Sequence, residues 1–248
     1  HLKHLREVLT RLRNARLTAN VRKSHFLTRS IGVLGHTLED GVIKPSLDKI
    51  QAIVTMKRPL LKTHLRSFIG LANYYSHFQD HFADIVAPLN DLLKKYQPEK
   101  LNWKPQHEVA WQQIKTNLIQ RPVLVAPNHT KPYILQTDAS DYGISAILVQ
   151  LDDNGIEHVV SYSSRKLLPR ETRYSVIEKE CLAILHGLFK HDNWIYGQHV
   201  TVQSDHKALM WLGSISQHSP RLARWALLLQ RYDVSTVWRP ANLNKNSD

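Results

Sequence analysis

The stretch Pro132-Tyr-Ile-Leu-Gln-Thr-Asp-Ala-Ser-Asp-Tyr-Gly-Ile-Ser-Ala-Ile-Leu-Val-Gln150 decides the fold that this sequence predicts. Its two apolar runs, Tyr133–Leu135 and Ile144–Val149, are rich in the β-branched, aromatic and aliphatic residues that strands favour. The polar segment Asp138–Gly143 between them is typical of a turn, so the stretch predicts a pair of strands. Asp138 stands where the first strand ends. It is either a turn residue that bonds to the local backbone or a metal ligand held on a rigid element.

Composition predicts a soluble globular protein. The chain has 248 residues, of which 42% are hydrophobic and 22% are charged, enough for one large domain or two modest ones. No apolar run approaches the roughly 18 residues of a membrane span, and the N-terminus does not resemble a signal peptide. A single cysteine, Cys181, excludes an internal disulfide framework. The fifteen histidines show no pair of the His-Glu-x-x-His kind that is typical of a zinc site.

The net charge of +12 indicates a polyanion as partner. The excess is uneven, because the first 60 residues hold 12 Lys and Arg against 4 Asp and Glu. A solubilising surface would also explain a positive charge. Binding to a membrane surface is the weaker alternative, since no isolated basic amphipathic segment stands out.

The N-terminal half of the chain is predicted to be mainly helical. Its helical periods and turn signals predict a basic amphipathic helix over 1–19, a hairpin over 26–42 with Ile31, Val33 and Leu34 in a strand, a helix from Ser46 that stops before Pro59, two or three helices over 61–96, and a helix over 106–120. The proline-containing segment after residue 120 is predicted to be a linker.

An aromatic stripe accompanies the helices of 61–96. Such a stripe is more often part of a core than a ligand surface. Interleaved polar residues keep contact with a nucleic-acid backbone as the alternative. The five aromatic residues are Phe68, Tyr74, Tyr75, Phe78 and Phe82.

Strands and helices alternate after the linker, which predicts an α/β domain. Beyond the opening pair, the predicted strands cover 157–163, 199–203 and 234–238, and the predicted helices cover 175–188, 207–212 and 220–232. Asp138 and Asp205 follow strands, Glu180 lies in an apolar helix, and Asp248 is the last residue. Clustered carboxylates repel one another unless cations neutralise them. Two Mg²⁺ ions roughly 3.5–4 Å apart are a recurrent solution for phosphodiester hydrolysis.

The sequence resembles the C-terminal part of the reverse transcriptase of gypsy-class long-terminal-repeat retrotransposons, continuing into their RNase H domain. Matching motifs run almost end to end in the family's order. They are Phe26 with Leu34-Gly-His36, Leu65-Arg-Ser-Phe-Ile-Gly-Leu-Ala-Asn-Tyr-Tyr75, Pro88-Leu-Asn-Asp-Leu-Leu-Lys94, Thr137-Asp-Ala-Ser140, Ser163-Ser-Arg165, Tyr174-Ser-Val-Ile-Glu-Lys-Glu-Cys-Leu-Ala183, Ser204-Asp-His206 and Arg221-Leu-Ala-Arg-Trp225.

The resemblance implies an α/β fold, an RNase H-like mixed five-stranded sheet with flanking helices, preceded by a mainly helical reverse-transcriptase thumb and connector. The implied divisions are a palm remnant over 1–45, the thumb and connector over 46–120, a linker over 121–131 and an RNase H domain over 132–248. The chain ends where the family begins a further helix. We expect an intracellular protein, in the cytoplasm, within virus-like particles or in the nucleus.

Four carboxylates match the family's catalytic and metal-binding set: Asp138, Glu180, Asp205 and Asp248. The resemblance implies that they hold two Mg²⁺ ions, or Mn²⁺, with Asp138 bridging both. A helical wheel does not choose Glu180 over Glu178, so that choice rests on the resemblance. Cys181 is interpreted as a small buried hydrophobe. Trp238–Ser247 lacks the His that cellular and retroviral RNases H have in the corresponding loop.

The expected activity is hydrolysis of the RNA strand of an RNA–DNA hybrid, without DNA synthesis, because the chain holds no Tyr-x-Asp-Asp motif. The alternative is an inactive nucleic-acid-binding remnant, and a third hypothesis is an assembly partner of a separate polymerase subunit. Other parts of the Pol polyprotein are expected partners, and a dimer is kept as an alternative for the oligomeric state. The residues expected to bind nucleic acid are Lys3, Arg6, Arg13, Arg22, Lys23, Leu34, Gly35, His36 and Arg66.

Overall fold

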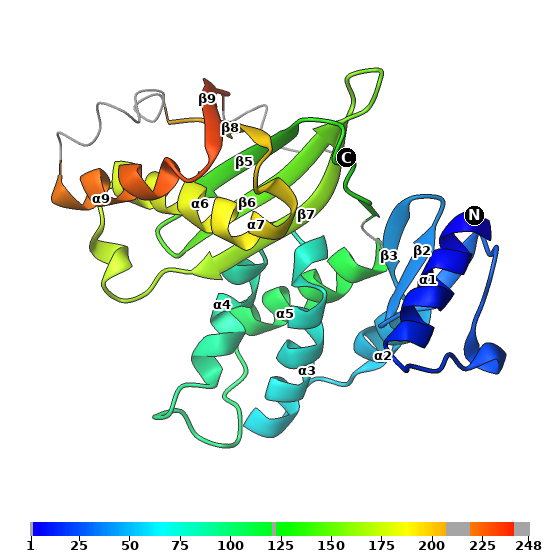
Figure 1. Cartoon of the computed structure of the whole chain (residues 1–248). Coiled ribbons are helices and arrows are strands. Elements are labelled where there is room, and N and C mark those ends of the chain that lie inside the picture. The colour runs from blue at the N-terminus through cyan, green and yellow to red at the C-terminus, as the bar shows by residue number, and fades with distance from the viewer. Residues whose placement is uncertain (1, 121–122, 207–218, 241–248) are drawn as a thin grey trace.

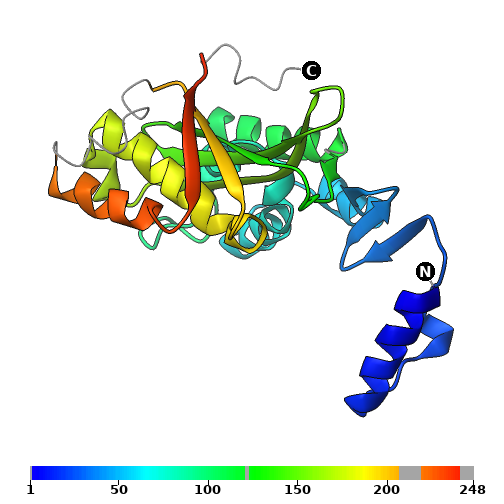
Figure 2. The same cartoon turned by 45° about the horizontal axis from the view of Figure 1, so that its top comes forward.

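The computed structural model describes residues 2–120, 123–206 and 219–240 (Figure 1). The N-terminal part of the chain is a basic helix followed by a small antiparallel sheet. Helix α1 (Leu2–Asn14) has no buried residue and projects away from the main body (Figure 2). The short helix η1 (Val21–Lys23) leads into strands β1 (Ser30–Val33), β2 (His36–Glu39) and β3 (Val42–Pro45), and β4 (Leu124–Val125) completes the sheet in the order β1-β2-β3-β4.

A two-residue turn joins β1 to β2. Leu34 and Gly35 have φ angles of 48° and 77°, as a tight hairpin turn requires, so the prediction that Leu34 lies in a strand is wrong. The hydroxyl of Tyr75 donates to the carbonyl oxygen of Gly35 at 2.9 Å, and Tyr74 donates to that of Leu34. These bonds fix the turn against the helices that follow.

The helical segment between β3 and β4 has a core of its own. Its elements are α2 (Leu47–Thr55), α3 (Lys62–Tyr74), η2 (Ser76–Phe78), α4 (Phe82–Leu92) and α5 (Pro105–Ile119). Phe68, Tyr75, Phe78 and Phe82 are buried in this core, which confirms the core interpretation for four of the five aromatic residues. Tyr74 is 48% exposed and supports the β1–β2 turn instead.

The segment predicted to be a linker contains strand β4. Leu124 pairs with Ile43 and Val125 pairs with Val42, and the Leu124 side chain is buried in the core of the helical segment. The nearby prolines pointed to an irregular connection. The apolar residues Leu124 and Val125 between these prolines pair with β3 instead, because Leu124 becomes buried when the sheet is extended.

The C-terminal part is an α/β domain, as predicted. Strands β5 (Tyr133–Ala139), β6 (Gly143–Leu151), β7 (Glu157–Lys166), β8 (His199–Ser204) and β9 (Asp233–Trp238) form one sheet in the order β7-β6-β5-β8-β9. The pairs β7–β6 and β6–β5 are antiparallel, whereas β5–β8 and β8–β9 are parallel. The predicted mixed five-stranded sheet is therefore confirmed.

Helices of this domain gather on one face of the sheet (Figure 1). They are η3 (Glu171–Arg173), α6 (Val176–Lys190), α7 (Asp192–Ile195) and α9 (Pro220–Leu229). Helix α6 lies close to β5 and β6 at Gly187, where a Cβ atom would come within 2.8 Å of the Ala146 side chain and 3.0 Å of Leu135. Only glycine allows this approach, which sets the distance between α6 and the sheet. The predicted helix over 207–212 lies outside the described residues.

The helical segment packs against the other side of the α/β domain. Helix α4 contacts β6 and β7, and η2 and β4 contact β7. Val159 and Tyr162 of β7 pack onto the core of the helical segment, so the two cores adjoin through β7. Among the described residues, no helix is long and apolar enough to cross a membrane.

Buried neutral histidines predict a loss of stability in acid. His191 is 1% exposed and its Nδ1 lies 2.8 Å from the Gly187 carbonyl oxygen; burial lowers its pKa to about 4. The unfolded chain binds a proton at His191 near pH 6.5 and the folded chain does not. The His191 contribution to the free energy of unfolding therefore falls as the pH drops from about 6.5 to about 4.

Urea unfolding across this pH range should show a smaller loss of unfolding free energy in His191→Gln than in the wild type. The exposed His25→Gln serves as the control, and an equal loss in all three proteins would contradict the expectation.

Candidate metal centre

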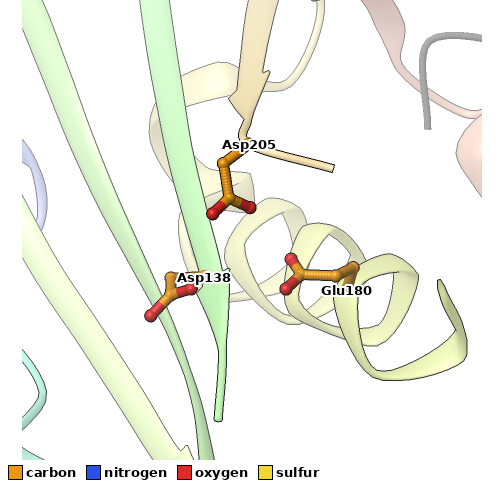
Figure 3. A group of neighbouring side chains, drawn as sticks. All are labelled: Asp138, Glu180 and Asp205. Atoms are coloured by element: carbon orange, nitrogen blue, oxygen red, sulfur yellow. The ribbon is translucent and has the colours of Figure 1, made fainter. Parts of the chain in front are cut away.

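Two of the predicted carboxylates meet because their strands run in parallel. Asp138 lies near the end of β5, and Asp205 directly follows β8. The β5–β8 pair is parallel, with Gln136 beside Gln203. The carboxyl ends of both strands consequently reach the same edge of the sheet, where Asp138 and Asp205 lie near each other (Figure 3).

Helix α6 supplies the third carboxylate, and the structure distinguishes Glu180 from Glu178. Glu178 belongs to a capping box at the start of α6: its Oε2 accepts from the Ser175 backbone at 3.0 Å. Its Oε1 accepts from Arg221 at 2.7 Å. Glu180 instead points towards Asp138 and Asp205 (Figure 3).

The three carboxylates form a tight acidic group. One ligand oxygen from each of Asp138, Glu180 and Asp205 lies within 4.8 Å of the others. Glu180 is 4% exposed, and its Oε2 has no hydrogen-bond partner. Burial, followed by the nearby charges of Asp138 and Asp205, raises the pKa of Glu180 to about 8, against the lowering effect of the hydrogen bond from the Ala139 backbone.

The donor set fits a hard divalent cation. All three groups offer carboxylate oxygens, which Mg²⁺ and Mn²⁺ prefer. A cation between them would satisfy the unpaired Glu180 oxygen and offset both the burial and the repulsion that favour the protonated form of this carboxyl group.

The helical segment also reaches this group through His81, which sequence reasoning missed. His81 stands before α4 with a φ of 47°, and its Nε2 lies 3.8 Å from Asp138 Oδ2 and 3.6 Å from Asp80 Oδ1. Contact with Asp84, then the charges of Asp80 and Asp138, raise the pKa of His81 to about 9 against the effect of burial. No local sequence signal connects His81 with Asp138, because the contact depends on how α4 docks on the sheet.

The other predicted site residues lie elsewhere. Asp248 is outside the described residues. The nucleic-acid-binding set is spread over α1 and η1, the β1–β2 turn and the exposed face of α3. Leu34 is 84% exposed at that turn, and His36 Nε2 lies 3.2 Å from His77 Nε2. Cys181 is buried as predicted, and burial followed by the Glu178 charge raises its thiol pKa to about 12, so it is not a nucleophile.

Comparison with known proteins identifies the class of this fold. Residues 128–232 match the family described as an RNase H-like domain found in reverse transcriptase. The foamy viral protease-reverse transcriptase solved with an RNA/DNA hybrid superposes with a TM-score of 0.81 at 19% identity, over 100% of this chain and 34% of that one. The foamy viral protease-reverse transcriptase dRH in complex with double-stranded DNA gives a TM-score of 0.78 over 100% of this chain and 44% of that one, also at 19% identity. The predicted RNase H-like fold is confirmed.

Sequence relatives cover the whole chain. The retrovirus-related Pol polyprotein from transposon 297 of Drosophila melanogaster is 34% identical over 248 residues, which are 100% of this chain and 23% of the relative. The Tf2-3 transposon polyprotein of Schizosaccharomyces pombe is 34% identical over 257 residues, covering 100% of this chain and 19% of the relative. The chain thus spans about a fifth of these curated relatives. Its homologues are retrotransposon Pol polyproteins, and residues 128–232 are an RNase H-like domain of the kind found in reverse transcriptase.

Metal binding should depend on the proton at Glu180. A cation must displace this proton, so Mn²⁺ affinity should rise as the pH increases towards about 8 and then level off. Glu180→Gln should weaken Mn²⁺ binding and remove most of this pH dependence. Calorimetric titration from about pH 6 to about pH 9 measures both effects. Glu178→Gln, two residues away on the same helix, should keep the wild-type pH profile, and a pH-independent wild-type affinity would contradict the assignment.

Proposed function

We propose that the C-terminal domain hydrolyses the RNA strand of RNA–DNA hybrids with divalent metal ions held by Asp138, Glu180 and Asp205. The observation that carries the proposal is the buried Glu180 carboxylate with an unpaired oxygen, grouped with two further carboxylates within 4.8 Å. A fold that only bound nucleic acid would gain nothing from this arrangement, because uncompensated carboxylates repel both one another and a phosphate backbone.

The chain's own residues define what the site can do. Asp138, Glu180 and Asp205 would hold two Mg²⁺ ions, with Asp248 as the fourth ligand that the family pattern implies. When bound, such ions activate a water molecule for attack and stabilise the leaving oxygen of a phosphodiester. The rigid sheet edge fixes Asp138 and Asp205, and the close packing of α6 at Gly187 fixes the depth of Glu180.

A hybrid as substrate agrees with the charge distribution. The first 60 residues carry most of the net positive charge, and α1 and η1 present their basic side chains to solvent. Phosphate neutralisation by Lys and Arg supplies most of the sequence-independent affinity for nucleic acids. The related foamy viral protein was solved with an RNA/DNA hybrid, which supports the same substrate class here.

The predicted divisions complete this proposal. Residues 1–45 would be a palm remnant, 46–120 the thumb and connector, and 132–248 the nuclease domain. Within that arrangement the β1–β2 turn of Leu34 and Gly35, with His36 at the start of β2, would contact the hybrid together with the basic N-terminal residues.

Replacing the first metal ligand tests the nuclease activity. Asp138→Asn should lower Mg²⁺-dependent cleavage of a labelled RNA–DNA hybrid by a factor on the order of 10³, because metal-assisted charge stabilisation contributes several kcal/mol. The matched control is Asp153→Asn in the turn between β6 and β7. Asp153 is 94% exposed at its side chain and pairs with Lys131 at 2.7 Å, so its replacement should leave cleavage unchanged.

Two outcomes would contradict the nuclease. One is equal cleavage by wild type and Asp138→Asn. The other is salt-sensitive binding of the hybrid without any cleavage, which would favour an inactive nucleic-acid-binding protein.

Salt dependence tests the basic N-terminal residues. Arg6 and Arg13 are exposed on α1. Replacing both with Ala should weaken hybrid binding and lower the slope of log affinity against log salt by about one for each phosphate that the protein no longer neutralises. Fluorescence anisotropy over a salt series measures the slope. Lys95→Ala, an exposed cation in the turn after α4, should leave it unchanged, and an equal effect of both variants would argue against phosphate binding by α1.

A further inference from the structure

The turn that follows Asp138 is organised around the hydroxyl group of Ser140. Its Oγ accepts from the backbone N–H groups of Gly143 at 2.9 Å and Tyr142 at 3.2 Å. The Ser140 backbone N–H in turn donates to the Gly143 carbonyl oxygen at 2.9 Å. With two donors bound to its oxygen, the hydroxyl has one proton left to donate.

Two acceptors lie within reach of that proton, one in the helical segment and one in the turn itself. Ser140 Oγ lies 3.3 Å from Asp84 Oδ2 and 3.4 Å from Asp84 Oδ1, and 3.2 Å from the Gly143 carbonyl oxygen. An ionised carboxylate is the stronger acceptor of the two. Asp84 is therefore the last acceptor in a chain of hydrogen bonds that begins at the backbone N–H groups of the turn and passes through the Ser140 hydroxyl group.

Asp84 is fitted closely against this turn. A Cβ atom on Gly143 would lie 2.5 Å from Asp84 Oδ1, so the carboxylate occupies the space beside the glycine backbone. Asp84 stands in the first turn of α4, where a negative charge is favourable. The N–H of the preceding Ala83 donates to Ser164 Oγ of β7 at 2.9 Å, which anchors the same end of α4 to the sheet.

A second contact joins the same helix end to Asp138 itself. His81 Nδ1 lies 3.8 Å from Asp84 Oδ2, and His81 Nε2 lies 3.8 Å from Asp138 Oδ2. Asp84 thus approaches Asp138 by two routes, through Ser140 in the turn and through the His81 ring.

We propose that Asp84 is a positioning residue of the metal centre, which holds the 139–143 turn and thereby the Asp138 carboxylate in place for metal binding. The inference rests on the proposed function, since it concerns the same carboxylates. It makes the helical segment part of the nuclease site, although none of the three grouped carboxylates comes from it. An ordinary docking contact would hold the two parts together without affecting the affinity for metal.

Asp91 offers a matched control for that distinction. It lies at the other end of α4 and joins the same two parts of the chain, because its Oδ1 lies 3.3 Å from Lys166 Nζ of β7. It has no contact with the 139–143 turn among the described interactions. Asp91→Ala therefore removes a contact between the same parts and leaves Ser140 and Asp138 untouched.

The test compares Mn²⁺ binding by the whole chain, measured by electron paramagnetic resonance well below each variant's melting temperature. Asp84→Ala should weaken Mn²⁺ binding about tenfold, the usual effect of losing a group that orients a metal ligand. Asp84→Asn, which keeps an oxygen acceptor for Ser140, should recover most of the affinity. Asp91→Ala should bind Mn²⁺ like the wild type. In hybrid cleavage, Asp84→Ala should raise the Mg²⁺ requirement by a similar factor and leave the KM for the hybrid unchanged.

Equal Mn²⁺ affinities of Asp84→Ala and Asp91→Ala would overturn the inference. If Asp84→Ala does not fold, Ser140→Ala removes the same bond from the other side and should show the same tenfold loss, and wild-type affinity in that variant would also overturn it. A wild type that binds Mn²⁺ without cutting the hybrid would contradict the proposed function alone, because the Mn²⁺ comparison still decides the role of Asp84.

Discussion

The repulsion among three carboxylates is the constraint on which the C-terminal domain depends. Asp138, Glu180 and Asp205 are held within 4.8 Å, and the Glu180 carboxyl group is buried with an unpaired oxygen. Such a group is unfavourable without a cation, so the surrounding fold must supply the stability that keeps it together. Parallel pairing of β5 with β8 and the close approach of α6 at Gly187 provide that support. The site is therefore a strained feature of an otherwise well-packed domain.

Most of the fold could be predicted from sequence, because its strands and helices carry strong local patterns. The stretch around Asp138 predicted β5, its turn and β6, and the later alternation of strands and helices predicted the α/β domain. Leu34 was misassigned to a strand, and the short strand at Leu124–Val125 was not predicted within the segment expected to be a linker. A turn with positive φ at a leucine has no local signature, and a two-residue strand has too little pattern to detect.

The candidate site was predictable only in part. Asp138 and Asp205 follow recognisable strands, yet neither periodicity nor spacing chose Glu180 over Glu178. The structure supplies the physical reason, because Glu178 is occupied by the helix cap and Arg221. The contacts of His81 with Asp138 and of Asp84 with Ser140 could not be predicted, since they arise from the docking of two hydrophobic cores on each other. Sequence patterns predict which residues form each core, but they do not predict which residues of the two cores contact each other.

The pairing of β3 with β4 makes the helical segment an insertion within one small sheet. The segment leaves the sheet after Pro45 and returns at Leu124, so its two ends lie on neighbouring strands. Paired strands are only about 5 Å apart, whatever the length of chain between them. Helices could thus be lengthened or shortened inside the insertion without changing the path from β3 through β4 to β5. The distance between the β1–β2 turn and the acidic group therefore does not depend on the length of the insertion, provided that the start of α4 keeps its position against the sheet.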